Sequence, residues 1–65
     1  MTLQEAIDRV EAIKGIASDD ETAHSEEDRL RHEVLEQIAA GCENASGYAA
    51  EVLKTSAIRF ARWCA

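Results

Sequence analysis

The fold is decided by residues 18–41, SDDETAHSEEDRLRHEVLEQIAAG, a stretch that makes up over a third of the 65-residue chain. Ser18 and Glu21 form a capping-box pattern, and acids in a first helical turn are favoured by the helix dipole. Gly41 suits a helix end, because glycine readily adopts the left-handed conformation found there. We predict one helix over residues 19–40. Its buried line has four-residue spacing and consists of Leu30, Val34 and Ile38.

The segment before this stretch also has a helical pattern. Thr2 and Glu5 form another capping box, which places the start of a helix at residue 3. Gly15 favours an end between residues 14 and 17, so we predict a helix over residues 3–16. Its apolar residues recur at helical spacing: Leu3, Ala6, Ile7, Val10, Ile13 and Ile16.

The segment after this stretch repeats a mostly apolar face at steps of three and four residues. Asn44 or Ser46 can cap it, and we predict a third helix over residues 46–64, with a separate short helix beginning at Thr55 or Ser56 as the alternative. Three amphipathic helices with short connections predict an all-α three-helix bundle in a single domain, residues 1–65. A helical hairpin that completes its core in a homodimer is the other arrangement we consider. The repeating face consists of Ala49, Val52, Leu53, Ser56, Ala57, Phe60, Ala61 and Cys64.

The formal charge of −6 is unevenly distributed: residues 1–44 carry −8 and residues 45–65 carry +2. An acidic body should repel nucleic acids and anionic membranes and attract a protein with a basic surface. The chain has no apolar run long enough to span a membrane and no secretory pattern after Met1. We therefore expect a cytoplasmic protein, in which Cys42 and Cys64 are reduced.

Histidines and acids cluster in the first half of the central stretch. His24, Asp28 and His32 recur at four-residue intervals, and Glu21 with His24 gives the Glu-x-x-His spacing of helical metal sites. A metal site also needs ligands on neighbouring helices, and the first and third predicted helices have no histidine. We therefore predict no metal and no cofactor. A metal-binding or small-ligand module built on His24, Glu27 and Asp28 is retained as an alternative hypothesis.

Glu27 falls on or beside the apolar line of the central helix, where an acid is costly unless it is paired. Arg62 or Arg59 could reach it across the bundle, forming a structural lock or, less favoured, the edge of a ligand pocket. Trp63 follows Arg62, and tryptophan and arginine dominate the energetics of many protein interfaces. The candidate binding residues are Asp20, Glu21, His24, Glu27, Asp28, Arg62 and Trp63.

Catalytic motifs are missing from the sequence. It has no glycine-rich phosphate loop, Ser-His-Asp set or dinucleotide-binding fingerprint. Cys64 could act as a nucleophile only with a base beside it, and nothing in the sequence requires one. We predict that the protein is not an enzyme.

Two motifs carry a resemblance to a known group of proteins. An acidic Asp-x-Glu-x-Ala-His-x-x-Glu-Asp-x-Leu stretch and a Lys-Thr…Phe-x-Arg-Trp-Cys-Ala ending resemble small proteins of similar length encoded in phages, prophages and bacterial genomes. Arg59 departs from the acidic residue of the pattern. The group has no assigned activity, so the resemblance implies a phage or prophage context and no reaction. The matching residues are Asp19 or Asp20, Glu21, Ala23, His24, Glu27, Asp28 and Leu30, then Lys54, Thr55, Phe60, Arg62, Trp63, Cys64 and Ala65.

These observations lead to one main hypothesis and two alternatives. The main hypothesis is a small acidic accessory protein of the phage or prophage type that acts by binding a macromolecular partner with a basic surface. The first alternative is the small-ligand or metal-binding module. The second is a purely structural dimer or assembly subunit, in which the acidic helix provides only solubility.

Overall fold

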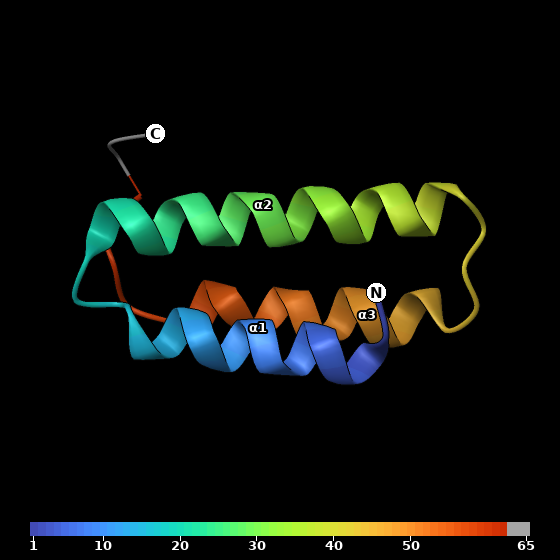
Figure 1. Ribbon diagram of the computed structural model, residues 1–65, viewed down its shortest axis with the longest axis horizontal. Helices are drawn as coiled ribbons and strands as arrows, with labels where there is room; N and C mark the ends of the chain where they lie inside the picture. The colour runs from blue at the N-terminus through green and yellow to red at the C-terminus, as the bar shows by residue number, and fades with distance from the viewer. Residues whose placement is uncertain (63–65) are drawn as a thin grey trace.

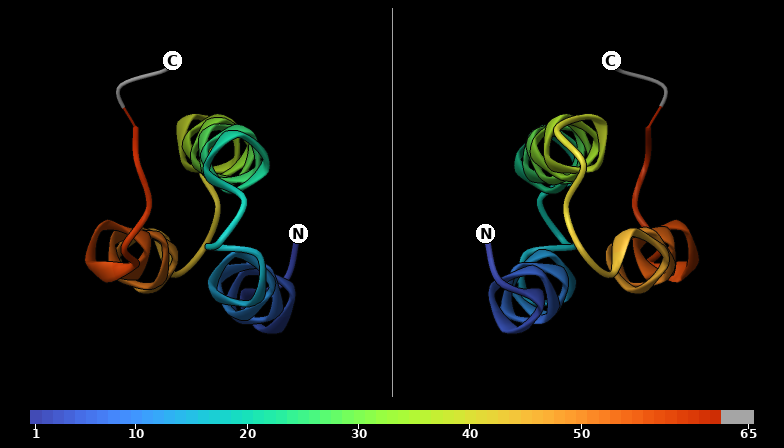
Figure 2. Two further views of the ribbon diagram at one scale, coloured as in Figure 1. Left: turned by 90° about the vertical axis from the view of Figure 1, so that its left-hand side faces the viewer. Right: turned by 90° about the vertical axis from the view of Figure 1, so that its right-hand side faces the viewer.

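The structure, a computed structural model, describes residues 1–62. It contains three helices, α1 (Leu3–Gly15), α2 (Asp20–Ala39) and α3 (Ala45–Leu53), followed by a short 3-10 helix, η1 (Lys54–Ala57). Figure 1 shows α1 and α3 side by side and parallel, with α2 running antiparallel to both above them. The end views in Figure 2 show the three helices in a triangle. The predicted all-α three-helix bundle is confirmed.

The first two helices begin and end close to the predicted residues. The capping box of Thr2 and Glu5 is present at the start of α1, with both reciprocal hydrogen bonds formed. The helix α2 begins within one residue of the predicted start, but the capping box predicted from Ser18 and Glu21 is not the cap. Asp19 is the N-cap, and its side chain accepts hydrogen bonds from the backbone and hydroxyl of Thr22. Gly41 has a φ of 86°, the left-handed conformation expected after a helix.

The third helix is much shorter than the predicted range of 46–64. α3 ends at Leu53, η1 ends at Ala57, and Ile58 is extended, with φ −78° and ψ 129°. The alternative of a break near Thr55 was the better prediction. Residues 58–62, which we call the C-terminal segment, turn back from α3 towards α2 (Figure 2). The helix prediction for residues 63 and 64 lies outside the described residues.

The core fills the space between the three helices. Tyr48 links α3 to the start of the chain, because its hydroxyl donates a hydrogen bond of 2.7 Å to the carbonyl of Met1. No helix among residues 1–62 is long and apolar enough to cross a membrane. The buried apolar residues come from α1, α2, α3 and the C-terminal segment: Ala6, Val10, Ile13, Ala23, Leu30, Val34, Tyr48, Val52 and Ile58.

Candidate functional site

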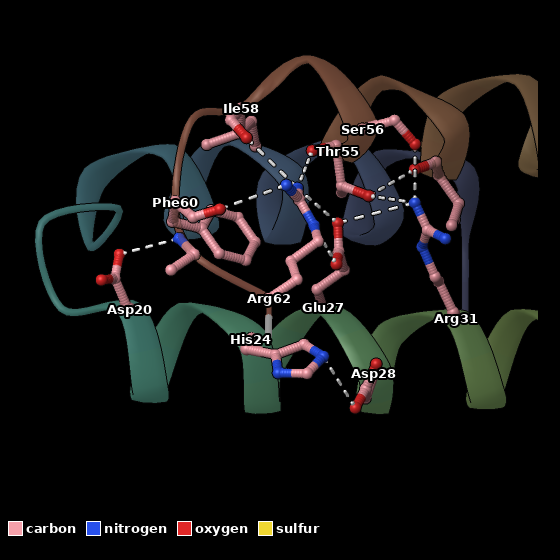
Figure 3. Close-up of polar contacts among 12 residues, drawn as sticks. Asp20, His24, Glu27, Asp28, Arg31, Thr55, Ser56, Ile58, Phe60 and Arg62 are labelled. Atoms are coloured by element: carbon pink, nitrogen blue, oxygen red, sulfur yellow. Dashed lines mark hydrogen bonds and ion pairs between the residues drawn. The ribbon is translucent and has the colours of Figure 1, made fainter. Parts of the chain in front are cut away.

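Glu27 is an acid in the core of the bundle. Its position on α2 between Ala23 and Leu30 leaves it only 3% exposed, so its charge requires a partner. Arg62 supplies that partner from the C-terminal segment: its Nε donates to Oε1 at 2.8 Å and its Nη2 to Oε2 at 3.0 Å (Figure 3). The predicted pairing of Glu27 with Arg62 is confirmed, and we call this bidentate pair the clamp. Arg59, the other candidate, is exposed.

The guanidinium of Arg62 also satisfies the backbone where helical structure ends. Its Nη2 donates to the carbonyl of Thr55 at 2.7 Å and to that of Ile58 at 3.2 Å, and its Nη1 donates to the carbonyl of Phe60 at 3.4 Å. The same group lies 3.9 Å from the centre of the Phe60 ring. Carbonyls at a helix end otherwise lack partners. Arg62 therefore stabilises the chain at the point where it leaves the helix despite the continuing apolar pattern.

A second guanidinium lies beside the clamp. The Nη2 of Arg31 donates to the hydroxyls of Thr55 at 3.0 Å and Ser56 at 2.9 Å, and it lies 3.5 Å from Oε2 of Glu27 (Figure 3). Thr55 is fully buried, and its own hydroxyl donates to the carbonyl of Val52 at 2.9 Å. The network therefore joins α2 to both η1 and the C-terminal segment.

The electrostatics of the clamp favour its charged form. Burial raises the pKa of Glu27, but the hydrogen bond from Arg62 and the positive charges of Arg31 and Arg62 lower it by more, so its pKa lies below the ordinary value. The hydrogen bond to Glu27 in turn raises the pKa of Arg62. Both groups therefore stay ionised at neutral pH, and the geometry supports the structural lock over the edge of a ligand pocket.

The other predicted site residues lie along the first half of α2. His24, with a side chain 12% exposed, has its Nε2 3.4 Å from Oδ2 of Asp28, which is 65% exposed. Asp20 accepts a hydrogen bond of 3.0 Å from the backbone amide of Ala61, so it anchors the C-terminal segment. Glu21 is exposed. Trp63 lies outside the described residues.

A metal ion fits this cluster poorly. His24, Glu27 and Asp28 each place one ligand atom within 4.8 Å of the others. Both oxygens of Glu27, however, already accept hydrogen bonds from Arg62, and Arg31 lies close by. A cation would have to approach two guanidinium groups, which repel it. All three donors also come from a single helix, whereas bundle metal sites draw ligands from facing helices.

The charges on the surface are paired unevenly. The basic residues of the helices form ion pairs with nearby acids: Arg9 with Glu33, Lys14 with Glu11, Arg29 with Glu26, and Lys54 with Glu51. In contrast, among residues 1–62 no lysine or arginine forms an ion pair with the exposed acids around the start of α2. We call this group the acidic end, and it consists of Asp19, Asp20, Glu21 and Asp28.

Three features of this region were not predicted. Arg31 follows Glu27 by four residues, a spacing that places them on one face of a helix and could have revealed the contact. The buried role of Thr55 has no sequence signal, because it depends on the break after α3. The third is a groove of about 240 Å³ between α2 and α3. It is lined by Arg31, Val34, Leu35, Ile38, Ala49, Val52 and Leu53.

Comparisons with known proteins assign the chain to no group. No family model, no curated protein and no solved structure matches it. Small helical bundles carry out many unrelated functions, so the fold alone does not select one. A functional proposal must therefore depend on the charges, contacts and exposed surfaces of this molecule.

Proposed function

We propose that the protein is a small, non-catalytic accessory protein of the phage or prophage type that binds a basic surface on another protein. The observation that carries the proposal is the acidic end, where four exposed carboxylates gather without a lysine or arginine partner among residues 1–62. The phage context depends on the sequence resemblance. The partner's class depends on charge, since complementary potentials speed and orient the association of two proteins.

The contacts around the acidic end favour a rigid binding surface. Asp19 caps α2, Asp20 holds the amide of Ala61, and the clamp fixes the C-terminal segment one to two turns further along α2. A surface that is already ordered loses little conformational entropy when it binds. The acids can therefore present a fixed pattern of charge to a partner.

The clamp changes the role we propose for the end of the chain. Arg62 uses its donors on Glu27 and on backbone carbonyls, so it positions the segment and is not itself a contact for a partner. Trp63, the next residue in the sequence, is proposed as an apolar contact for the partner, in keeping with the frequent role of tryptophan at interfaces. The proposed contact residues are then Asp20, Glu21, His24, Asp28 and Trp63.

A capture experiment with matched charge reversals tests this function. The protein is immobilised, exposed to bacterial host lysate at low and high salt, and the retained proteins are quantified. We expect one or more basic proteins to be retained at low salt and released at high salt, because exposed charges are screened. The double variant Glu21→Lys with Asp28→Lys should lose them.

The matched control is Glu36→Lys with Glu43→Lys, which changes the net charge equally at the opposite end of α2. This control should retain the partner at close to the level of the unaltered protein. If nothing is retained at low salt, or if both double variants lose the partner equally, the proposal is wrong.

A further inference from the structure

The groove between α2 and α3 is an apolar surface that the clamp and the acidic end do not use. Its floor contains the buried side chains of Val34 and Val52, and its volume is about 240 Å³. Leu35 and Leu53 stand at its edges, and each is 64% exposed. Two large apolar side chains beside one hollow form a patch, unlike the isolated exposed leucines found on most proteins.

The lining of this groove carries little charge, although 31% of the chain is charged. Arg31 is the only charged residue in the lining, and its guanidinium is turned towards hydroxyls of η1. Glu51 and Lys54 are not part of the lining, and they pair with each other at 2.8 Å. The remaining exposed residues of α3 and η1 that follow this face are small or apolar: Ser46, Ala50, Leu53, Ser56 and Ala57.

We propose that this face binds a second copy of the chain, forming a two-fold symmetric dimer through the groove. A two-fold contact requires one patch that complements itself. This patch carries both a projection and a hollow, so Leu53 of each copy can enter the groove of the other. Burial of Leu35 and Leu53 removes apolar surface from water, which is the main driving force for such contacts.

The charge distribution favours a second copy over a charged partner at this face. The protein carries a net charge of −6, so two copies repel each other over most of their surfaces. The groove lining contains no acid to add to that repulsion, and its one charged residue, Arg31, already donates to hydroxyls of η1, so the lining offers little charge for an acidic or basic partner to recognise. The acidic end lies outside the groove lining and stays free in the dimer.

The size of the molecule agrees with this proposal. A standard interface buries roughly 800 Å² of each partner, which is about a fifth of the 4232 Å² accessible surface of the chain. The groove lies between two helices of a triangular bundle (Figure 2), so an interface of that size would cover the groove and the helix surfaces around it. Chains of this length also have small cores and often gain stability by association.

Analytical ultracentrifugation across micromolar to millimolar concentrations tests the dimer. We expect a concentration-dependent monomer–dimer equilibrium that persists at high salt, because the contact is apolar. Leu53→Glu should raise the dissociation constant at least about tenfold, since it would bury a charge without a partner. Leu53→Ala, which adds no charge, should raise it by a smaller factor.

Ala12→Glu is the matched control, because it adds the same charge at an exposed position on α1, away from the groove lining. It should leave the dissociation constant within about threefold of the original. Circular dichroism confirms that each variant is folded. A monomer at every concentration, or equal weakening by Ala12→Glu and Leu53→Glu, would overturn the proposal. Neither result bears on lysate capture by the acidic end, so the two proposals fail separately.

Discussion

The line along which α2 faces α3 and the residues that follow α3, which we call the seam, has two halves that are built differently. In the first half of α2, the C-terminal segment closes the seam, and Arg62 reaches through it to Glu27. In the second half, no other part of residues 1–62 covers the seam, and the groove edged by Leu35 and Leu53 is open. The closed half is polar at its centre and the open half is apolar. The first half therefore serves the fold of the monomer, whereas the second is the half through which we propose association.

The use of an ion pair in the closed half has a physical consequence. A buried pair often adds little net stability compared with apolar residues of the same size, but removal of one partner is strongly destabilising. The clamp therefore determines where the C-terminal segment binds more than how stable the bundle is. An apolar side chain at position 62 could pack at several places along the seam, whereas the bidentate guanidinium of Arg62 matches one carboxylate.

The largest predicted effect comes from breaking the closed half with Arg62→Ala. This change leaves Glu27 buried without its main partner and removes the donors for three backbone carbonyls. We expect a loss of about 3 kcal/mol in the free energy of unfolding, the low end for a broken buried pair, because the Arg62 side chain is 35% exposed. Urea denaturation followed by circular dichroism measures this loss.

Arg59→Ala provides the matched control, since Arg59 is exposed and lies three residues away in the same segment. We expect its effect to stay within about 0.5 kcal/mol. Equal losses for the two variants would show that the segment contributes through general charge and that the clamp has no special role.

A smaller effect should follow from acid, which weakens the closed half without removing a side chain. The pKa of Glu27 lies below its ordinary value of 4.5 in the folded protein, so the unfolded chain takes up this proton first as the pH falls. The stabilising contribution is therefore complete above about pH 4.5 and is lost as the pH falls through the lowered pKa. The loss should be smaller than for Arg62→Ala, because a protonated carboxyl still accepts a hydrogen bond.

The measurement is the free energy of unfolding from about pH 7 to about pH 3. Glu5 has a lowered pKa from its capping box with Thr2 and contributes to the same fall. Glu27→Gln isolates the clamp, because it cannot lose a charge and should flatten the acid side of the curve. An unchanged acid slope in Glu27→Gln would show that the clamp does not carry this pH dependence.

The closed half also shows how far the sequence predicts the structure. Periodicity was enough for α1 and α2, and it placed Glu27 on or beside the buried line. The need to pair its charge then left Arg62 or Arg59 as the partner, and the structure selects Arg62. Periodicity failed for the end of α3, because an apolar repeat of three and four residues continues past Thr55. Tertiary contacts decide that position: the hydroxyl of Thr55 and the guanidinium of Arg62 take backbone carbonyls that a continuing helix would use.

The open half was harder to predict for a related reason. Leu35 and Leu53 look like core residues in sequence, and only the positions of α2 and α3 show that they stand at the edge of a groove. The helical spacing of apolar residues predicts an apolar face on a helix. It does not indicate whether the same chain or another molecule covers that face. Charge patterning was a better guide, since the acidic end could be located from the sequence.

The smallest predicted effect belongs to the open half, and it comes from Leu35→Ala compared with Leu30→Ala. The two changes are chemically identical and lie on the same helix, but Leu30 is fully buried and Leu35 is 64% exposed. In dilute solution, Leu30→Ala should cost about 3 kcal/mol through lost burial and a cavity. Leu35→Ala should stay within about 0.5 kcal/mol of the original protein.

The dependence of stability on protein concentration then distinguishes a residue of the core from a residue of the dimer contact. If the groove binds a second copy, the original protein gains stability as its concentration rises, because association favours the folded state. Leu35→Ala should lose part of that gain, so its small deficit should grow with concentration, whereas the deficit of Leu30→Ala should change much less. Thermal unfolding across the same concentration range measures both trends. A Leu35→Ala deficit that does not grow with concentration would mean that Leu35 contributes nothing to association and that the open half is not the dimer contact.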